Sequence, residues 1–211
     1  KKRVYDPVIQ ALSGLTDVQR DQETGRPHMM RLVIPDKVTS LTAAQAITAA
    51  LLARERTGKG QHVRLSMLDT LVSFLWGSDM ASQTFIGSDI PQQEAASFID
   101  LIYETADGHI SVAVQTDREW HALTRALDRP EWLEDERFKT PALRQKFIDD
   151  RLVKTQEVLS TGTSAEWLAR LEEADVPCSP VLTRSEVIQH PQVIANEVLW
   201  ESEHHLAGKL R

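Results

Sequence analysis

Apolar positions in the first part of the chain predict two helices joined by a turn. Residues 40–56 are rich in alanine and leucine, and residues 67–85 carry leucine, valine, phenylalanine and tryptophan. In each run the apolar residues surround the helix axis, so we expect both helices to be buried on most sides. Glycines in residues 57–60 predict the turn, and alternation in residues 61–66 predicts a short strand.

The pattern changes after a linker at residues 87–93, which we interpret as a domain boundary. Residues 98–103 and 109–114 read as two strands, and Asp107 followed by Gly108 is a typical hairpin turn. Residues 142–159 predict a helix. This second part of the chain is therefore expected to be a small α+β domain.

Three further helix starts are predicted by the Thr-x-x-Glu pattern, in which the two side chains satisfy free backbone N–H groups. The pairs are Thr116 and Glu119, Thr163 and Glu166, and Thr183 and Glu186.

Composition narrows the class of protein. The formal net charge is -7 and 41% of the 211 residues are hydrophobic, which suits a globular protein and argues against a nucleic-acid partner. No apolar run is long enough to cross a bilayer, so no membrane partner is expected. Cys178 is the single cysteine, which favours a reducing, cytoplasmic location. The chain starts without Met, so we expect it to begin inside a longer protein.

Several kinds of site find no support in the sequence. The histidines lack metal-ligand spacing, so no metal site is predicted. Neither a nucleotide phosphate loop nor a Gly-x-Ser-x-Gly nucleophile motif is present. Cys178 has no neighbouring base in the sequence and is interpreted as a packed small residue.

Asp36 is the clearest candidate for a reactive residue. It lies between an apolar run and the predicted helix of residues 40–56. From the residues alone, a helix cap or turn is the favoured reading. The alternative is a reactive carboxylate, with the positive end of the helix stabilising an oxyanion formed beside it.

Four stretches, in this order, resemble the family III CoA-transferases, also called the CaiB/BaiF family. They are residues 5–14 (YDPVIQALSG); Asp36-Lys37 with the alanine-rich helix; residues 56–69 (RTGKGQHVRLSMLD); and a last group of Asp107-Gly108, Trp120, residues 135–138 and residues 176–181.

The resemblance implies an α/β fold with a Rossmann-like large domain, a small α+β domain and two interlocked subunits. Residues 1–93 would be the middle of the large domain, residues 94–180 the small domain, and residues 181–211 the return to the large domain. The family's N-terminal segment and C-terminal tail would be absent. That N-terminal segment normally contributes much of the CoA site.

The resemblance also implies a chemistry. Asp36 matches the family's catalytic aspartate, which carries CoA as an aspartyl thioester during transfer between carboxylic acids. Arg3, Tyr5 and Asp6 match a stretch that lines the CoA and acyl pocket. No permanent cofactor is implied, because acyl-CoA is a substrate, and the expected assembly is an interlocked homodimer.

Two departures bear on the reaction. There is no glycine run between Gly87 and Gly108, so formate and oxalate specificity is not predicted. Tyr5 stands where racemases of the family carry a histidine. Because racemisation needs two acid/base groups, a racemase is a less favoured hypothesis. CoA transfer is therefore the first hypothesis. An acyl-CoA isomerase and a non-catalytic CoA-binding assembly protein stay open as alternatives.

Overall fold

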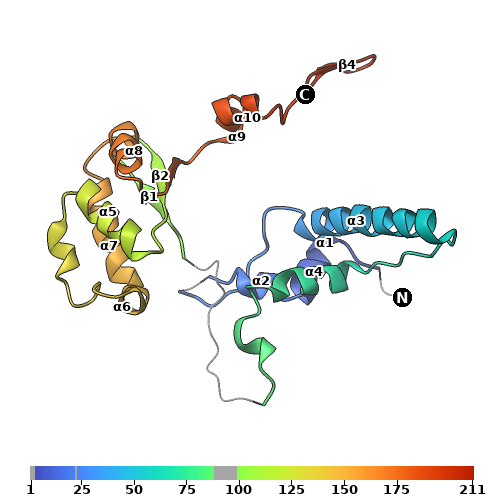
Figure 1. Ribbon diagram of the computed structural model, residues 1–211, viewed down its shortest axis with the longest axis horizontal. Coiled ribbons are helices and arrows are strands. Elements are labelled where there is room, and N and C mark those ends of the chain that lie inside the picture. The colour runs from blue at the N-terminus through green and yellow to red at the C-terminus, as the bar shows by residue number, and fades with distance from the viewer. Residues whose placement is uncertain (1–2, 22, 88–98) are drawn as a thin grey trace. The chain divides into compact units, whose positions relative to one another are not determined.

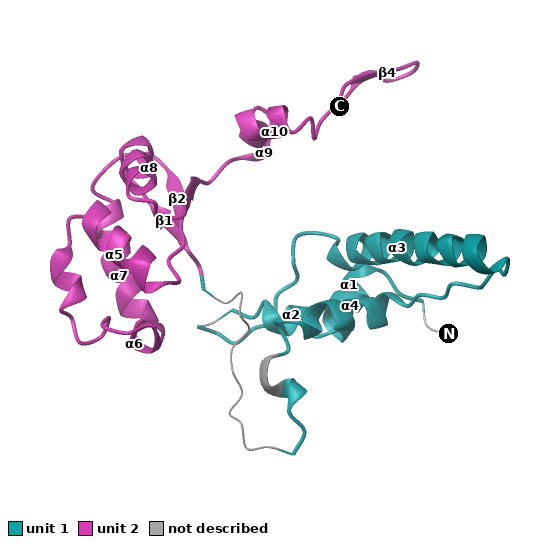
Figure 2. Ribbon diagram, viewed as in Figure 1, with its two compact units in different colours: residues 1–99 teal, residues 100–211 magenta. Residues whose placement is uncertain are grey.

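The structure, a computed structural model, describes residues 3–21, 23–87 and 99–211. The chain divides into two compact units, Lys1–Ile99 and Asp100–Arg211 (Figure 2). The predicted division into residues 1–93, 94–180 and 181–211 stays a prediction.

The first unit is helical where the structure describes it (Figure 1). Its elements are α1 (Asp6–Leu12), α2 (Leu15–Val18), α3 (Ile34–Thr57), α4 (Met67–Trp76) and the 3-10 turn η1 (Ala81–Thr84). Helices α1, α3 and α4 contact one another, and α3 lies along α4. A small core of Ile9, Leu15, Leu71 and Leu75 joins α1, the start of α2 and α4.

Three predictions for this unit are wrong in detail. Helix α3 begins at Ile34, six residues before the predicted start, because Pro35 suits a first helical turn. Residues 61–66 form no strand, since the described part of this unit offers no strand to pair with. Helix α4 ends at Trp76, where Gly77 follows, and the chain then makes a separate 3-10 turn.

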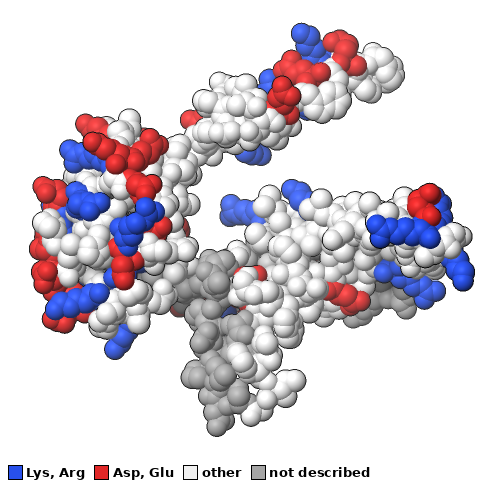
Figure 3. All heavy atoms as spheres, in the orientation of Figure 1, with Lys and Arg blue, Asp and Glu red and all other residues white. Residues whose placement is uncertain are grey.

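The predicted burial of α3 is also wrong for the chain by itself. Pro35 is its one buried residue, whereas Leu41 is 73% exposed and Ile47 is 50% exposed. Helices α1 and α4 are the main elements in contact with α3, and many of its apolar side chains stay exposed among the described residues. Figure 3 shows the uncharged surface along α3, with Lys and Arg gathered at its end, where Arg54 and Arg56 lie in the last turn.

The second unit has a sheet and helices with one shared core. An antiparallel sheet in the order β1-β2-β3 is formed by β1 (Ile102–Glu104), β2 (His109–Val112) and β3 (Cys178–Pro180). The helices are α5 (Asp117–Ala126), the 3-10 helix η2 (Pro130–Leu133), α6 (Pro141–Lys146), α7 (Ile148–Leu159) and α8 (Ser164–Glu173). The predicted hairpin is confirmed, with Tyr103 opposite Ile110, although residue 98 lies outside the described residues.

All three Thr-x-x-Glu capping boxes are confirmed, at the starts of α5, α8 and α9 (Arg184–Val187). The helix predicted at residues 142–159 is instead two helices. Phe147, at φ -106° and ψ 42°, separates α6 from α7.

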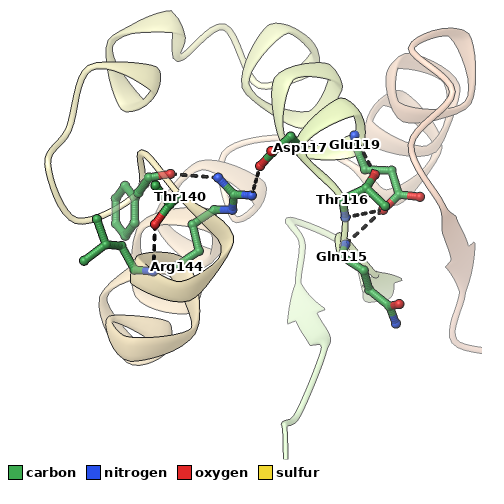
Figure 4. Close-up of polar contacts among 8 residues, drawn as sticks. Gln115, Thr116, Asp117, Glu119, Thr140 and Arg144 are labelled. Carbon is green, nitrogen blue, oxygen red and sulfur yellow. Dashed lines mark hydrogen bonds and ion pairs between the residues drawn. The ribbon is translucent and has the colours of Figure 1, made fainter.

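A buried arginine joins α6 to α5 in this unit (Figure 4). Arg144 is 4% exposed, donates to the Phe138 carbonyl at 2.9 Å and forms an ion pair with Asp117. Its guanidinium also lies over the Trp120 ring. Because a buried charge is costly unless it is paired and hydrogen-bonded, this set of contacts fixes the packing of α6.

The last segment contains short elements. They are α9, α10 (Pro191–Ala195) and a hairpin of β4 (Ser202–His204) and β5 (Gly208–Leu210). Within the described ranges, no helix is both long and apolar enough to cross a membrane. The same ranges hold no cluster of three His, Cys, Asp or Glu residues placed to bind a metal ion.

Candidate active site

Asp36 lies in the first turn of α3 with its carboxylate exposed. The N-cap residue of this helix is Val33, which makes no side-chain cap, and Pro35 follows in the first turn. Among the described residues we find no hydrogen bond or ion pair on the Asp36 carboxylate. Asp36 is therefore not the cap of its own helix, and its side chain is left available for chemistry.

The capping group of α3 comes from α1. A carboxylate oxygen of Asp6 (Oδ2) accepts the backbone N–H of Asp36 at 3.2 Å. Its other oxygen (Oδ1) accepts from Gln10 Nε2 at 2.6 Å, one turn later in α1. Asp6 is 5% exposed, so both oxygens are engaged inside the protein.

Gln10 extends this junction to the segment that precedes α3. It is 3% exposed. Its amide nitrogen also donates to the Leu32 carbonyl at 3.0 Å, and its amide oxygen accepts the Met30 N–H at 3.0 Å. One buried side chain thus links α1, residues 30–32 and the Asp6 carboxylate.

Arg3 and Tyr5 are exposed just before α1. Tyr5 is the N-cap residue, with its side chain 76% exposed and its carbonyl accepting the Val8 N–H at 3.0 Å. Because Tyr5 directly precedes Asp6, its backbone lies beside the start of α3. Among the described residues, neither Arg3 nor Tyr5 forms a hydrogen bond or ion pair with the Asp36 side chain.

The comparisons with known proteins place this chain in a family. The family-wide pattern of CoA-transferase family III matches residues 1–211. The chain belongs to CoA-transferase family III. This confirms the predicted family.

Curated relatives from family III are CoA-transferases by name. Succinyl-CoA:glutarate CoA-transferase of Homo sapiens is 28% identical over 210 residues, covering 98% of this chain and 47% of that protein. Succinyl-CoA:mesaconate CoA-transferase of Haloarcula marismortui is 29% identical, and the match covers 93% of this chain and 49% of that protein. Formyl-CoA:oxalate CoA-transferase of Shigella sonnei is 26% identical, and the match covers 98% of this chain and 55% of that protein. The chain spans about half the length of these relatives.

Solved structures agree with the family III fold. A crystal structure of Rv3272 from M. tuberculosis is 25% identical, with a TM-score of 0.81 over 99% of this chain and 55% of that one. A CaiB/BaiF family protein from Brucella suis is 25% identical, with a TM-score of 0.75 over 96% of this chain and 53% of that one. The predicted fold class, a mixed α/β fold of this family, is therefore confirmed.

The expected anion site at the start of α3 is largely occupied in this family III chain. Pro35 has no N–H, the Asp36 N–H donates to Asp6, and the Lys37 N–H donates to the Val33 carbonyl at 3.2 Å. These three residues offer no free backbone donor to an oxyanion. An oxyanion formed at Asp36 therefore needs donors other than these three amides.

Gln10 was not predicted as a site residue. The available signal was its i,i+4 spacing from Asp6, which places both side chains on one face of a helix. Its bonds to Met30 and Leu32 join positions more than 20 residues apart, and no local pattern indicates them.

A cavity of about 280 Å³ lies beside the later half of α3. Ile47, Leu51, Arg54, Gly60 and His62 are among its lining residues. Asp36 is not among them, and the cavity is not part of this candidate active site.

Proposed function

We propose that the protein transfers coenzyme A between carboxylic acids, with Asp36 as the covalent nucleophile. The observation that carries this proposal is the Asp36 carboxylate, which is exposed, free of partners among the described residues and attached to a capped helix start. The names of the curated relatives support the reaction class, because each names a CoA donor and an acid acceptor.

The proposed reaction proceeds through two kinds of covalent intermediate on Asp36, a mixed anhydride and a CoA thioester. A carboxylate oxygen of Asp36 attacks the thioester carbonyl, the C–S bond breaks and CoA thiolate leaves, giving a mixed anhydride. The thiolate then attacks the Asp36 carbonyl, so the donor acid leaves with its carboxylate and Asp36 becomes a CoA thioester. The acceptor carboxylate attacks this thioester, and the same steps run in reverse to release the new acyl-CoA and free Asp36.

Two further site residues are proposed to act on the substrate. Arg3 is exposed and could pair with a phosphate or carboxylate of acyl-CoA, since guanidinium groups bind both geometries well. Tyr5 is exposed beside the Asp6–Asp36 junction and could orient the thioester. Asp6 was predicted to line the same pocket, but its two oxygens are already used inside the protein.

The proposal also covers the substrates, the assembly and the location of the protein. Acyl-CoA and a carboxylic acid are the small-molecule partners, and no resident cofactor takes part. We propose an interlocked homodimer, supported by the exposed apolar side of α3. A cytoplasmic location is proposed on the single, unpaired Cys178, whose partial burial raises the pKa of its thiol.

The test is the loss of CoA transfer in Asp36→Ala and Asp36→Asn of the full-length protein. We expect transfer to fall below detection, while the circular dichroism spectrum and unfolding midpoint stay close to those of the wild type, because Asp36 is exposed. Wild-type protein treated with acyl-CoA and hydroxylamine should carry a mass change at Asp36, and the variants should not.

Label exchange identifies the reaction class in the same preparations. Exchange of labelled acids into acyl-CoA without deuterium uptake at the α-carbon supports transfer. Deuterium uptake alone would identify an isomerase, and the absence of both would identify a binding protein. Full transfer activity in Asp36→Ala would refute the nucleophile assignment.

A further inference from the structure

The buried pair of Asp6 and Gln10 is the strongest polar feature of the first unit that the proposed mechanism leaves unused. Both side chains are at least 95% buried, and both lie in α1. A carboxylate is retained in such a place only when its oxygens are hydrogen-bonded, because desolvation of an unpaired charge costs several kcal/mol. The two bonds that satisfy Asp6 are those to Gln10 and to the backbone of Asp36.

The geometry holds the chain on both sides of the turn into α3. Before the turn, Gln10 binds the Leu32 carbonyl and the Met30 N–H. After the turn, Asp6 binds the N–H of Asp36. Residues 33–35, which lie between these anchors, carry no side-chain cap and include Pro35.

A helix end without a side-chain cap leaves its first N–H groups unsatisfied and frays. Here the residue at that helix end is the proposed nucleophile. The Asp36 side chain itself has no partner among the described residues, so its position depends on its backbone.

We infer that Gln10 and Asp6 form a clamp that positions Asp36, and that Asp6 takes part through this clamp instead of by binding substrate. Gln10 is a positioning residue: it orients Asp6 and holds residues 30–32, and Asp6 in turn fixes the amide of Asp36. This inference rests on the proposed function for its catalytic consequence. The clamp itself is a property of the fold.

Two variants test the clamp in the full-length protein. Gln10→Met keeps an unbranched side chain of similar length and removes every hydrogen bond of the amide. Asp6→Asn keeps the size of Asp6 but makes one of its two positions a donor. That position then faces the N–H of Gln10 or of Asp36, so one bond must break. Gln19→Met is the matched control, because Gln19 is exposed at the end of α2.

The first measurement is hydrogen exchange at the Asp36 amide. Its donor position in the first turn has no acceptor within the helix, so protection of this amide reports the bond to Asp6. We expect exchange to be about tenfold faster in Gln10→Met and in Asp6→Ala, which removes the acceptor of the Asp36 N–H, and unchanged in Gln19→Met. This measurement does not require catalysis.

The second measurement separates positioning from substrate binding. A displaced nucleophile lowers kcat by about tenfold to a hundredfold, because small errors in reacting geometry are costly, while KM for acyl-CoA changes by less than about threefold. Higher KM with unchanged kcat in Asp6→Asn would place Asp6 in the substrate pocket and overturn the inference. Asp6→Ala and Gln10→Ala remove the same hydrogen bonds, so both should also lower kcat.

The outcomes of the two measurements are distinct. Unchanged exchange at Asp36 in both variants overturns the clamp, whatever the activity. A wild-type protein that exchanges slowly at Asp36 but transfers no CoA refutes the proposed function and leaves the clamp supported. If Gln10→Met fails to fold, Asp6→Ala decides by the same two measurements, because it leaves the Asp36 N–H without its side-chain acceptor.

Discussion

Tyr5 is the side chain that best separates the two enzymatic readings. It is exposed, and the family resemblance predicts that it stands where a racemase would carry its second acid/base group. In a transferase the Tyr5 hydroxyl only orients the thioester, so Tyr5→Phe should slow CoA transfer about tenfold, equivalent to about 1 to 1.5 kcal/mol. In an isomerase that uses Tyr5 to move a proton, α-proton exchange should fall a hundredfold or more.

The measurement is acid exchange and deuterium uptake in parallel, with Tyr5→His as a companion variant. We expect no new epimerisation from Tyr5→His, since both acid/base groups must face the same α-carbon. Robust epimerisation in that variant would show a pocket already shaped for racemisation and would reverse the ranking of the two reactions.

At the residue scale, local roles could be predicted and distant ones could not. Asp107 was predicted as part of a turn, and the hairpin is there. Its carboxylate also accepts the Ser164 N–H at 2.7 Å, 57 residues away at the start of α8, which holds the pKa of Asp107 below its usual value. Asp36 is predicted as the nucleophile from the family resemblance, and it stays a prediction. The contacts of Gln10 could be recognised only from the positions of residues 30–32 in the structure.

At the scale of elements, the capping boxes lead to a pH prediction. The Glu119 carboxylate accepts the Thr116 and Gln115 N–H groups, and the Glu166 carboxylate accepts from the backbone and hydroxyl of Thr163. These bonds favour the charged form and lower the pKa of both carboxyls from the usual 4.5. The stabilisation is therefore present above about pH 4.5 and is lost as the pH falls below it.

We expect the free energy of unfolding to decrease as the pH is lowered from about 5 to about 3. A double variant, Glu119→Gln with Glu166→Gln, keeps an acceptor at each position without the charge, so its unfolding free energy should depend less on pH. Urea unfolding followed by tryptophan fluorescence across this range is the measurement. The same pH slope in the double variant and the wild type would contradict the assignment.

Elements were predicted well where their signals are local. A Thr-x-x-Glu box contains both halves of its own hydrogen-bond pattern, and all three boxes were found. Alternation in residues 61–66 gave a false strand, because a strand also needs a partner that its own sequence does not specify. The break at Phe147 was missed, since neither glycine nor proline marks it.

At the scale of the whole molecule, the exposed side of α3 shows why burial is hard to predict. The sequence predicts apolar residues all round this helix, but burial depends on which other elements cover it. Leu41, Ile47, Leu51 and Leu52 are all exposed in this chain. Several exposed apolar side chains on one helix are typical of a surface that another part of an assembly covers.

The last prediction is that the full-length protein is a stable homodimer with α3 in its buried part. Sedimentation at micromolar concentration should show a dimer, because removal of exposed apolar surface from water favours association. Ile47→Asp should weaken the dimer or destabilise the subunit, since it would bury an unpaired charge in the assembly. Val153→Asp is the control, because Val153 is similarly exposed but lies on α7 of the second unit. A stable monomer of the wild type at these concentrations would contradict the interlocked dimer, and the cover of α3 would then have to come from within one subunit.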